Sequence, residues 1–340
     1  MNRACRLRKK ATAIRMQPII VASSCALAFV CLACLSLILL ILPSNTNADD
    51  TSRSIVFVLS GDSPVYNHVA KTTEEFILHD CNSSLIECNE LIFDRQSHEN
   101  FHFADLDQTT LTIALGIKAT NQAERLQQAG NQLHAMLPYI AHSIPHSNES
   151  REIADIYIDQ PYIRYFNLIK ATIPRARRVG LLIHESNLDQ IDNLTKTASQ
   201  QDFTLKTSVI TSERDVGEAI SYLLNDIDVL LALPDSRIHN SQTISHILTT
   251  AYRNSIPVIG FSSAYVKAGA TAAVYTSLDD ISHQVSDTVL EFLTYGYVKN
   301  RSQQAKYFSV AFNFEVARSL GLPPISPSEI KHNILEGGSK

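Results

Sequence analysis

Residues 229–269 restrict the fold of this chain more than any other segment. Residues 229–233 and 256–260 are short apolar runs that are typical of buried strands. The stretch between them carries apolar residues at helical spacing, namely Ile244, Ile247, Leu248 and Ala251. Two strands joined by an amphipathic helix form the repeating unit of a parallel sheet. The segment therefore predicts a βαβ unit.

A polar turn follows each of these two strands. Asp235 stands after the first strand, and Ser262, Ser263 and Tyr265 stand after the second. Because parallel strands end at the same edge of a sheet, both turns are expected at one edge, where open α/β sheets bind small ligands. The two turns therefore predict half of a ligand-binding site.

The same alternation of strand and helix patterns extends over most of the chain. Further strands are predicted at residues 54–59, 90–93, 111–115, 135–140, 153–158, 178–183, 205–210, 271–275 and 307–312. Helices are predicted at residues 66–79, 120–129, 187–200, 214–225, 281–293 and 315–320, and one more helix ends at residue 172. Such alternation is typical of parallel sheets covered by helices on both faces. We expect an α/β fold of two Rossmann-like lobes with a ligand cleft between them.

The domain boundaries follow from the point at which the pattern begins again. We expect residues 1–50 to be an export signal or membrane anchor with its linker. The remaining boundaries place residues 51–157 with 279–300 in lobe 1, residues 158–278 with 301–325 in lobe 2, and residues 326–340 in a C-terminal tail. Hinges are expected near residues 159–161 and 277–280.

The N-terminus has the charge pattern of an exported protein. Basic residues crowd the first 15 positions, and an uncharged, mostly apolar run follows at residues 19–42. This run exceeds the about 7–15 residues of a signal-peptide core and suffices to span a bilayer as a helix. Small residues at positions 46–48 suit cleavage, so a cleaved signal and an uncleaved anchor with a cytoplasmic basic end both stay open. In both cases the folded body lies outside the cytoplasm.

Cysteine usage agrees with export. Of the six cysteines, only Cys81 and Cys88 lie in the predicted folded body. A cysteine pair in an exported protein forms a disulfide more often than a metal site. We therefore predict a disulfide between Cys81 and Cys88, with two free thiols as the alternative.

Charge and motifs exclude several classes of protein. The net charge of −5 argues against a nucleic-acid-binding surface. The chain has no G-x-x-x-x-G-K phosphate loop and no G-x-S-x-G nucleophile elbow, which argues against an ATPase and against a hydrolase of that type. Residues 98–102 fit the H-E-x-x-H zinc pattern, but they lie between two strand patterns and predict a surface loop. We expect no catalytic residue, no metal and no cofactor.

Four segments of the chain resemble one protein family. They are residues 230–240, residues 247–284, the inter-lobe pattern within residues 159–180, and FEVARSLGL at residues 314–322. These segments are similar to ABC-transporter substrate-binding proteins, in the branch of the type I periplasmic binding proteins that includes aromatic amino acid binders. The resemblance is strong over residues 155–322 and weak over residues 54–150. It implies the type I periplasmic binding protein fold, with a ligand enclosed between the lobes by hinge closure.

The resemblance implies ligand contacts in the second lobe. Asp235 would meet a ligand amino group, Ser262 and Ser263 would supply hydroxyl and N–H groups, and Tyr265 belongs to the same motif. From the residues alone a simpler role stays open for each of them. Asp235 is a favoured helix cap, and the two serines suit a turn.

The first lobe is expected to contribute the other half of the site. Lys118, Ala119 and Thr120 follow a predicted strand, where the family presents small hydroxyl residues and N–H groups to a ligand carboxylate. Lys118 and Ala119 depart from that pattern, and Thr120 is equally suited to cap a helix. Ser60 and Asp62 in the first turn are predicted to line the site. A helix N-terminus attracts an anion and a carboxylate attracts a cation, so the two lobes together suit a zwitterion such as an amino acid.

We therefore expect the extracytoplasmic solute-binding component of an ABC importer, a periplasmic protein that is not an enzyme. Its expected partners are a small-molecule ligand and an ABC permease in the inner membrane, and we expect a monomer. A repressor with similar lobes would begin with a helix-turn-helix, whereas here the export segment occupies that place. The alternative is a membrane-anchored sensor or accessory domain, held by residues 19–42, that signals to a membrane partner without transport.

Overall fold

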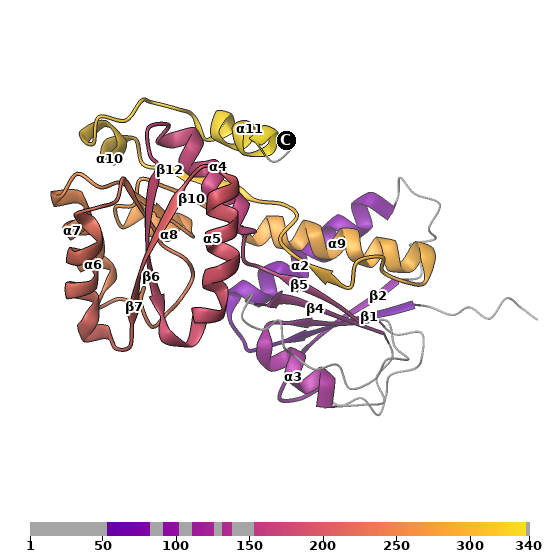
Figure 1. Ribbon diagram of the computed structural model, residues 1–340. Coiled ribbons are helices and arrows are strands. Elements are labelled where there is room, and N and C mark those ends of the chain that lie inside the picture. Colours follow the sequence, from indigo (N-terminus) through magenta and orange to yellow (C-terminus); the bar gives the residue numbers. More distant parts are fainter. Residues whose placement is uncertain (1–52, 82–90, 102–110, 126–130, 138–152, 338–340) are drawn as a thin grey trace, which may run out of the picture. The chain divides into compact units, whose positions relative to one another are not determined.

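The computed structural model describes residues 53–81, 91–101, 111–125, 131–137 and 153–337 (Figure 1). Within those ranges no helix has both the length and the apolar composition needed to cross a membrane. The predicted export segment at residues 19–42 lies outside them.

The first sheet has six strands in the order β11-β5-β4-β3-β1-β2. All of its pairings are parallel. The strands are β1 (Arg53–Leu59), β2 (Leu91–Ser97), β3 (Leu111–Leu115), β4 (Asn131–Leu137), β5 (Ile153–Tyr157) and β11 (Ser302–Gln303). The chain starts near one edge of the sheet, crosses to its neighbours on both sides, and is therefore doubly wound.

The second sheet repeats this plan with the order β12-β10-β9-β8-β6-β7. Its strands are β6 (Arg178–His184), β7 (Thr204–Ile210), β8 (Val229–Leu231), β9 (Val258–Gly260), β10 (Ala272–Tyr275) and β12 (Ser309–Phe312). The edge strand β12 is antiparallel to β10, and the other pairings are parallel. The prediction of a two-lobed α/β fold with parallel sheets is confirmed.

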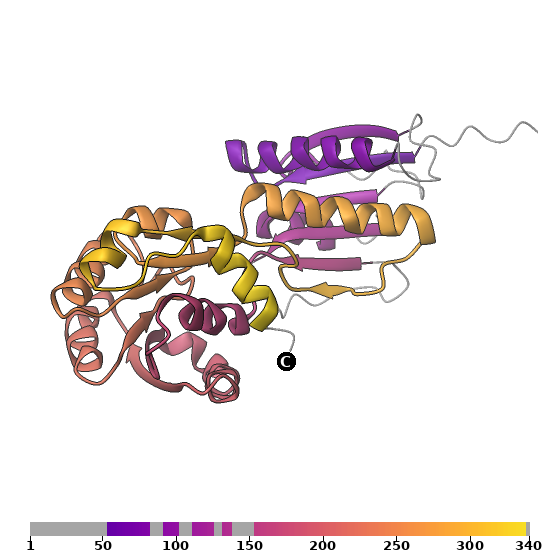
Figure 2. The ribbon, with the colours of Figure 1, turned by 90° about the horizontal axis from the view of Figure 1, so that it is seen from above.

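Two helices cover one face of the first sheet and a third covers the other. Figure 2 shows α2 (Pro64–Cys81) and α9 (Leu278–Tyr295) side by side over one face. Alternate residues of β1 point to opposite faces, so Ile55 and Phe57 join the core under these two helices. Val56 and Val58 face α3 (Ile117–Arg125) instead.

The second sheet is also covered on both faces. One core joins it to α4 (Tyr162–Thr172), α5 (Ile191–Gln200), α10 (Phe314–Ser319) and α11 (Pro327–Gly337). The other core joins it to α6 (Val216–Leu224), α7 (Ile244–Arg253) and α8 (Ser263–Lys267). Along β6, Leu181 and Ile183 enter the first of these cores and Leu182 enters the second.

The predicted C-terminal tail is instead largely the helix α11, which lies against α4 (Figure 1). Ile330 and Ile334 are fully buried there, and Asn167 Nδ2 of α4 donates a hydrogen bond of 3.2 Å to the carbonyl oxygen of Ile334. The two isoleucines are one helical turn apart, so they form an apolar stripe that packs onto the lobe. A second difference concerns β11, which pairs with β5 of the first sheet although its residues were expected in lobe 2.

Three crossings connect the two sheets, at residues 158–161, 276–277 and 304–308. Gln160 Nε2 donates to Thr276 Oγ1 at 2.6 Å, and Thr276 Oγ1 donates to the carbonyl oxygen of Ile158 at 2.5 Å. Arg164 Nη1 donates to Gln160 Oε1 at 2.7 Å and to the carbonyl oxygen of Ala305 at 2.6 Å. The three crossings are therefore joined by one hydrogen-bond network, which includes the first of the two predicted hinges.

Candidate ligand-binding site

A pocket lies at the carboxyl ends of β6 and β8. Its lining comes from the first and third crossings, from α4, and from the segments that follow β6 and β8. The lining residues are Asp159, Gln160, Pro161, Tyr162, Tyr165, Leu181, Leu182, Ile183, His184, Asn187, Gln190, Leu233, Pro234, Asp235, Ile238 and Gln304. This is the edge of the sheet at which the sequence predicts a ligand.

The inner wall of the pocket is apolar and aromatic. Leu181, Leu233 and Ile238 line it together with the rings of Tyr162 and Tyr165. Tyr165 is buried, and burial together with the nearby Asp159 carboxylate raises the pKa of its hydroxyl well above the ordinary value. The hydroxyl of Tyr165 therefore stays neutral, and the wall suits an uncharged, apolar group of a ligand.

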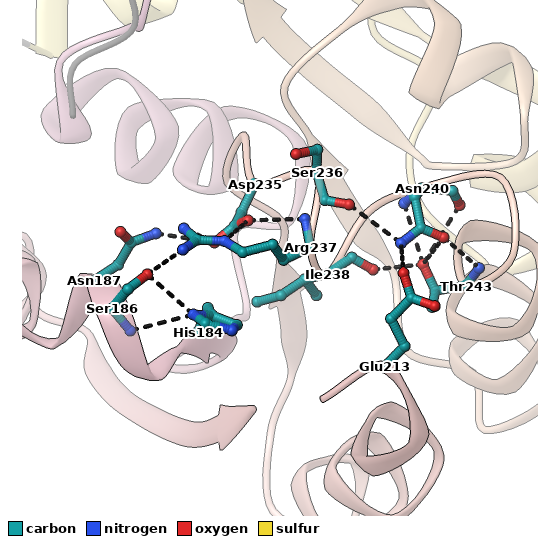
Figure 3. Close-up of polar contacts among 10 residues, drawn as sticks. All are labelled: His184, Ser186, Asn187, Glu213, Asp235, Ser236, Arg237, Ile238, Asn240 and Thr243. Atoms are coloured by element: carbon teal, nitrogen blue, oxygen red, sulfur yellow. Dashed lines mark hydrogen bonds and ion pairs between the residues drawn. The ribbon is translucent and has the colours of Figure 1, made fainter. Parts of the chain in front are cut away.

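Asp235 lines the pocket, and its carboxylate accepts four hydrogen bonds (Figure 3). Its Oδ1 accepts hydrogen bonds from the backbone nitrogen and from Nε of Arg237, both at 2.9 Å. Its Oδ2 accepts from Arg237 Nη2 at 3.0 Å and from Asn187 Nδ2 at 2.9 Å. The predicted contact of Asp235 with a ligand amino group would therefore have to replace one of these donors.

The segments after β6 and β8 are tied together by the same arginine. Arg237 Nη1 donates to Ser186 Oγ, which lies 3.0 Å from His184 Nδ1. His184 Nδ1 also accepts from the backbone nitrogen of Ser186 at 3.2 Å and so begins the 3-10 helix Glu185–Gln190. As Figure 3 shows, Arg237 lies between Asp235 and the residues that follow β6.

The loop that carries Asp235 is held in shape by Asn240. Asn240 Nδ2 donates to Glu213 Oε1 at 2.7 Å and to the carbonyl oxygen of Ser236 at 3.1 Å (Figure 3). Thr243 Oγ1 donates to the carbonyl oxygen of Ile238 at 2.5 Å. These bonds fix the backbone of the loop and so orient the Asp235 carboxylate before any ligand arrives.

Tyr265 lies beneath this loop rather than in the pocket lining. Its side chain is buried, and its hydroxyl lies 3.0 Å from His239 Nδ1. Burial lowers the pKa of His239 to about 4, so the imidazole is neutral at pH 7 and suited to accept from the hydroxyl. The Tyr265 ring also packs so closely on Gly260 that a Cβ there would lie 2.7 Å from its Cδ1. The structure thus places Tyr265 in the core of the lobe.

Ser262 caps the helix α8, whereas the simpler role predicted for it was that of a turn residue. Its Oγ accepts a hydrogen bond of 3.1 Å from the backbone nitrogen of Tyr265, at the start of α8. Ser263 is the first residue of α8 and is partly exposed. Neither serine lines the pocket at β6 and β8, and a ligand contact of either remains a prediction.

In the first lobe the structure brings Ser60 to the start of α3. Ser60 Oγ accepts from the backbone nitrogen of Ala119 at 3.0 Å. Thr120 is buried, and its Oγ1 has no hydrogen-bond partner among the described residues. Lys118 and Asp62 are exposed. Ser60 therefore lies at the start of α3, beside the residue that precedes Thr120, although the two are 60 positions apart in the sequence. A ligand contact of any of these four residues stays a prediction.

Sequence reasoning missed several residues of the pocket. Asn187 and Gln190 follow β6, Gln160 lies in the first crossing, and Tyr162 is the first residue of α4. The signal for Asn187 was present, because a polar run follows a buried strand there just as at β8. Tyr162 carries no such signal. Its place in the pocket, and the hydrogen bond of 2.8 Å from its hydroxyl to Gln190 Oε1, depend on tertiary packing.

The remaining predicted sites fall partly outside the described residues. Cys81 is buried at the end of α2 and is disulfide-bonded, whereas Cys88 lies outside the described ranges. Residues 98–100 form a turn after β2, and His98 Nδ1 lies 3.2 Å from the carbonyl oxygen of Leu59. His102 is not among the described residues, and within those residues no group of three metal-ligating side chains occurs.

A family model and a curated protein each match part of this chain. Residues 155–323 match the family described as ABC transporter substrate binding protein. The tyrosine-binding protein of Clostridioides difficile (strain R20291) is 27% identical over 129 residues, which cover 37% of this chain and 37% of that protein. The matched segment thus spans well under half of the curated relative.

Two solved structures share the fold. A ligand-free, open structure of a substrate binding protein with adhesive properties from Clostridium difficile has a TM-score of 0.65 at 19% identity, covering 82% of this chain and 97% of that one. The ABC domain in complex with L-Trp from Streptococcus pneumonia has a TM-score of 0.54 at 14% identity, covering 83% and 98%. The resemblance seen in the sequence is confirmed: residues 155–323 match the ABC transporter substrate binding protein family.

Proposed function

We propose that this protein is the extracytoplasmic solute-binding component of an ABC importer and captures a small molecule by closure of its two lobes. The observation that carries the proposal is the composition of the pocket. Its lining joins Asp159, Gln160 and Pro161 of the first crossing to Asn187 and Asp235 of the second lobe. A ligand held there touches both the binding edge of a sheet and the hinge.

In this proposal, hinge closure couples ligand binding in the pocket to the relative position of the two lobes. A ligand that binds the closed form better shifts the equilibrium between open and closed lobes, without any chemical step. The three crossings bend as a unit in this proposal, because Gln160 and Arg164 join them through hydrogen bonds. The family itself is named for substrate binding and not for a reaction.

The proposed ligand is a small amino acid-like molecule with an apolar side chain. The wall around Tyr162, Tyr165 and Leu233 suits the apolar part, and the polar rim around Asn187 and Asp235 suits the charged part. Two relatives carry names that point the same way, one a tyrosine-binding protein and one solved with L-Trp. By analogy with its family, we place the protein outside the cytoplasm, with an ABC permease as its partner.

The alternative function is a membrane-anchored sensor. It is favoured by one feature of the sequence, the length of the uncharged run at residues 19–42. N-terminal sequencing of the protein isolated from its own membranes and periplasm separates the two. A mature form that begins near Asp49 supports the importer component, and an intact N-terminus supports the sensor.

A thermal-shift screen tests the proposed ligand class. The purified protein is heated with each of the common amino acids, and with nucleosides and sugars as comparison sets. A ligand at about 100 times its Kd stabilises the native state by about 2.7 kcal/mol, which raises the melting temperature. We expect such a shift with amino acids that have apolar side chains. A shift with sugars or nucleosides alone would contradict the proposed ligand class.

A further inference from the structure

The carboxylate of Asp235 has no acceptor position left for a ligand. A carboxylate offers about four lone-pair sites, two on each oxygen. Oδ1 accepts two hydrogen bonds from Arg237, and Oδ2 accepts one from Arg237 and one from Asn187. The side chain of Asp235 is only 8% exposed. The charge that a ligand ammonium group would seek is thus already neutralised and hydrogen-bonded.

Unlike the Asp235 carboxylate, the guanidinium of Arg237 still has hydrogen-bonding groups that are not in use. A guanidinium carries five N–H donors, and those of Arg237 make three side-chain hydrogen bonds, two to Asp235 and one to Ser186. Its other two N–H groups have no hydrogen-bond partner among the described residues. Its side chain is 42% exposed. The arginine therefore has both the donors and the access to solvent that a ligand anion needs.

Arg237 lies beside the pocket, since it is bonded to the lining residue Asp235, but it is not itself a lining residue. The guanidinium connects Asp235, which follows β8, to Ser186, which lies between the lining residues His184 and Asn187 (Figure 3). The lining itself contains two carboxylates, those of Asp159 and Asp235, and neither lysine nor arginine. Arg237 thus supplies the positive charge at this part of the rim.

We propose that Arg237 binds the carboxylate of the ligand and that Asp235 is a positioning residue that holds the guanidinium in place. This inference rests on the proposed function and specifies which end of the ligand the second lobe recognises. A guanidinium binds carboxylates through paired, charge-assisted hydrogen bonds, for which its rigid plane is suited. The assignment reverses the role that the sequence predicted for Asp235.

The role of Arg237 is tested by isothermal titration calorimetry with three probes that share the same side chain. They are L-tyrosine, tyramine, which lacks the carboxylate, and 3-(4-hydroxyphenyl)propanoate, which lacks the amine. A second set built on leucine contains L-leucine, isopentylamine and 4-methylpentanoate. Each probe is titrated into the wild-type protein and into Arg237→Gln, Arg237→Lys and Asp235→Asn. Arg253→Gln is the control, because Arg253 is an exposed arginine on α7, outside the pocket lining.

We expect the wild-type protein to bind the amino acid and the carboxylate analogue of one set and to bind the amine weakly. Arg237→Gln is expected to weaken binding of the amino acid and of the carboxylate analogue by about 10- to 100-fold, as when a charged hydrogen bond is lost, and to leave the amine unchanged. Arg237→Lys should keep the preference for the carboxylate at lower affinity. Asp235→Asn should reduce the preference for the carboxylate analogue over the amine, because the hydrogen bonds that orient the Arg237 guanidinium are weakened.

Two results would overturn this inference alone. One is an amine that binds as tightly as its parent amino acid, and the other is an Arg237→Gln variant that still binds the carboxylate analogue with wild-type affinity. A variant with merely damaged structure would lose affinity for all three probes alike and would melt at a lower temperature without ligand. If the wild-type protein binds none of the six probes, the proposed ligand class fails, and the inference fails with it.

Discussion

Gln160 and Thr276 lie 116 positions apart in the sequence, yet Gln160 Nε2 donates a hydrogen bond of 2.6 Å to Thr276 Oγ1. This bond joins the first crossing between the lobes to the second. Thr276 Oγ1 in turn donates a hydrogen bond to the carbonyl oxygen of Ile158. The first two crossings are therefore joined by hydrogen bonds, and each of these bonds can be tested separately.

Thr276→Val should destabilise the protein because valine keeps the shape of threonine but removes the hydroxyl. Gln160 Nε2 and the carbonyl oxygen of Ile158 would each lose a partner, at a cost of about 1–3 kcal/mol. Urea denaturation measures the free energy of unfolding. Thr249→Val on the exposed side of α7 is the matched control and should change little. Equal stability of the two variants would contradict a structural role of the hydrogen bond between Gln160 and Thr276.

Removing the apolar stripe of α11 should destabilise the second lobe. Ile334→Ala leaves a cavity under a fully buried side chain, and such substitutions cost about 2–5 kcal/mol. The neighbouring Leu335 is 54% exposed, so Leu335→Ala should change the free energy of unfolding by no more than about 0.5 kcal/mol. The comparison is made by denaturant unfolding. A similar loss in both variants would mean that α11 does not pack as described.

His239 should make the stability of the protein depend on pH. Burial lowers the pKa of His239 from 6.5 to about 4, against a smaller opposing effect of the Asp235 carboxylate. Between these two values the unfolded chain binds more protons than the folded protein, so the contribution is complete above about pH 6.5 and is lost as the pH falls toward 4. Over this window the wild type should lose about 3 kcal/mol more stability than His239→Gln.

Urea unfolding at pH 7 and pH 4.5 measures this difference. The control is His246→Gln, which changes an exposed histidine on α7 and should keep the pH dependence of the wild type. If His239→Gln also keeps that dependence, another group is responsible for it. The comparison of the two variants separates His239 from the carboxylates that titrate in the same range.

Gly260→Ala should disturb the support beneath the Asp235 loop. The added Cβ would lie 2.7 Å from Cδ1 of the buried Tyr265 ring, which in turn contacts His239. Overpacking of this kind costs about 1–3 kcal/mol. Gly61→Ala is the control, because a Cβ there has no neighbour within 4 Å. Thermal unfolding of both variants provides the measurement, and an unchanged melting temperature of Gly260→Ala would show that Tyr265 can move aside at little cost.

Several features of the fold could be predicted from the order of residues. The strands β1, β3 and β6 are continuous apolar runs, as expected of strands that are buried on both faces of a sheet. Such runs can be recognised in the sequence without knowing which elements pack against them. The position of Asp235 at the carboxyl edge followed from the sequence of strand, turn and helix. Boundaries were less certain: β8 ends at Leu231 and β9 begins at Val258, each two residues short of the predicted limits that face the loops.

The contacts of the site residues could not be predicted from the local sequence pattern. Asn187 and Asp235 are 48 positions apart, and Ser186 and Arg237 are 51 apart, so no local pattern records that they meet. The burial of α11 likewise depends on α4, far earlier in the chain.

The amino-acid sequence by itself determined the strand and helix order, the two-lobed α/β fold, and the edge of the sheet at which polar residues gather. Local periodicity suffices for these, because it reflects which face of each element is buried. Only the tertiary structure decided that Asp235 is enclosed by Arg237 and Asn187, and that three crossings share one hydrogen-bond network. Hydrogen bonds between distant residues depend on how the packed elements bring side chains together, and that arrangement is a property of the whole fold.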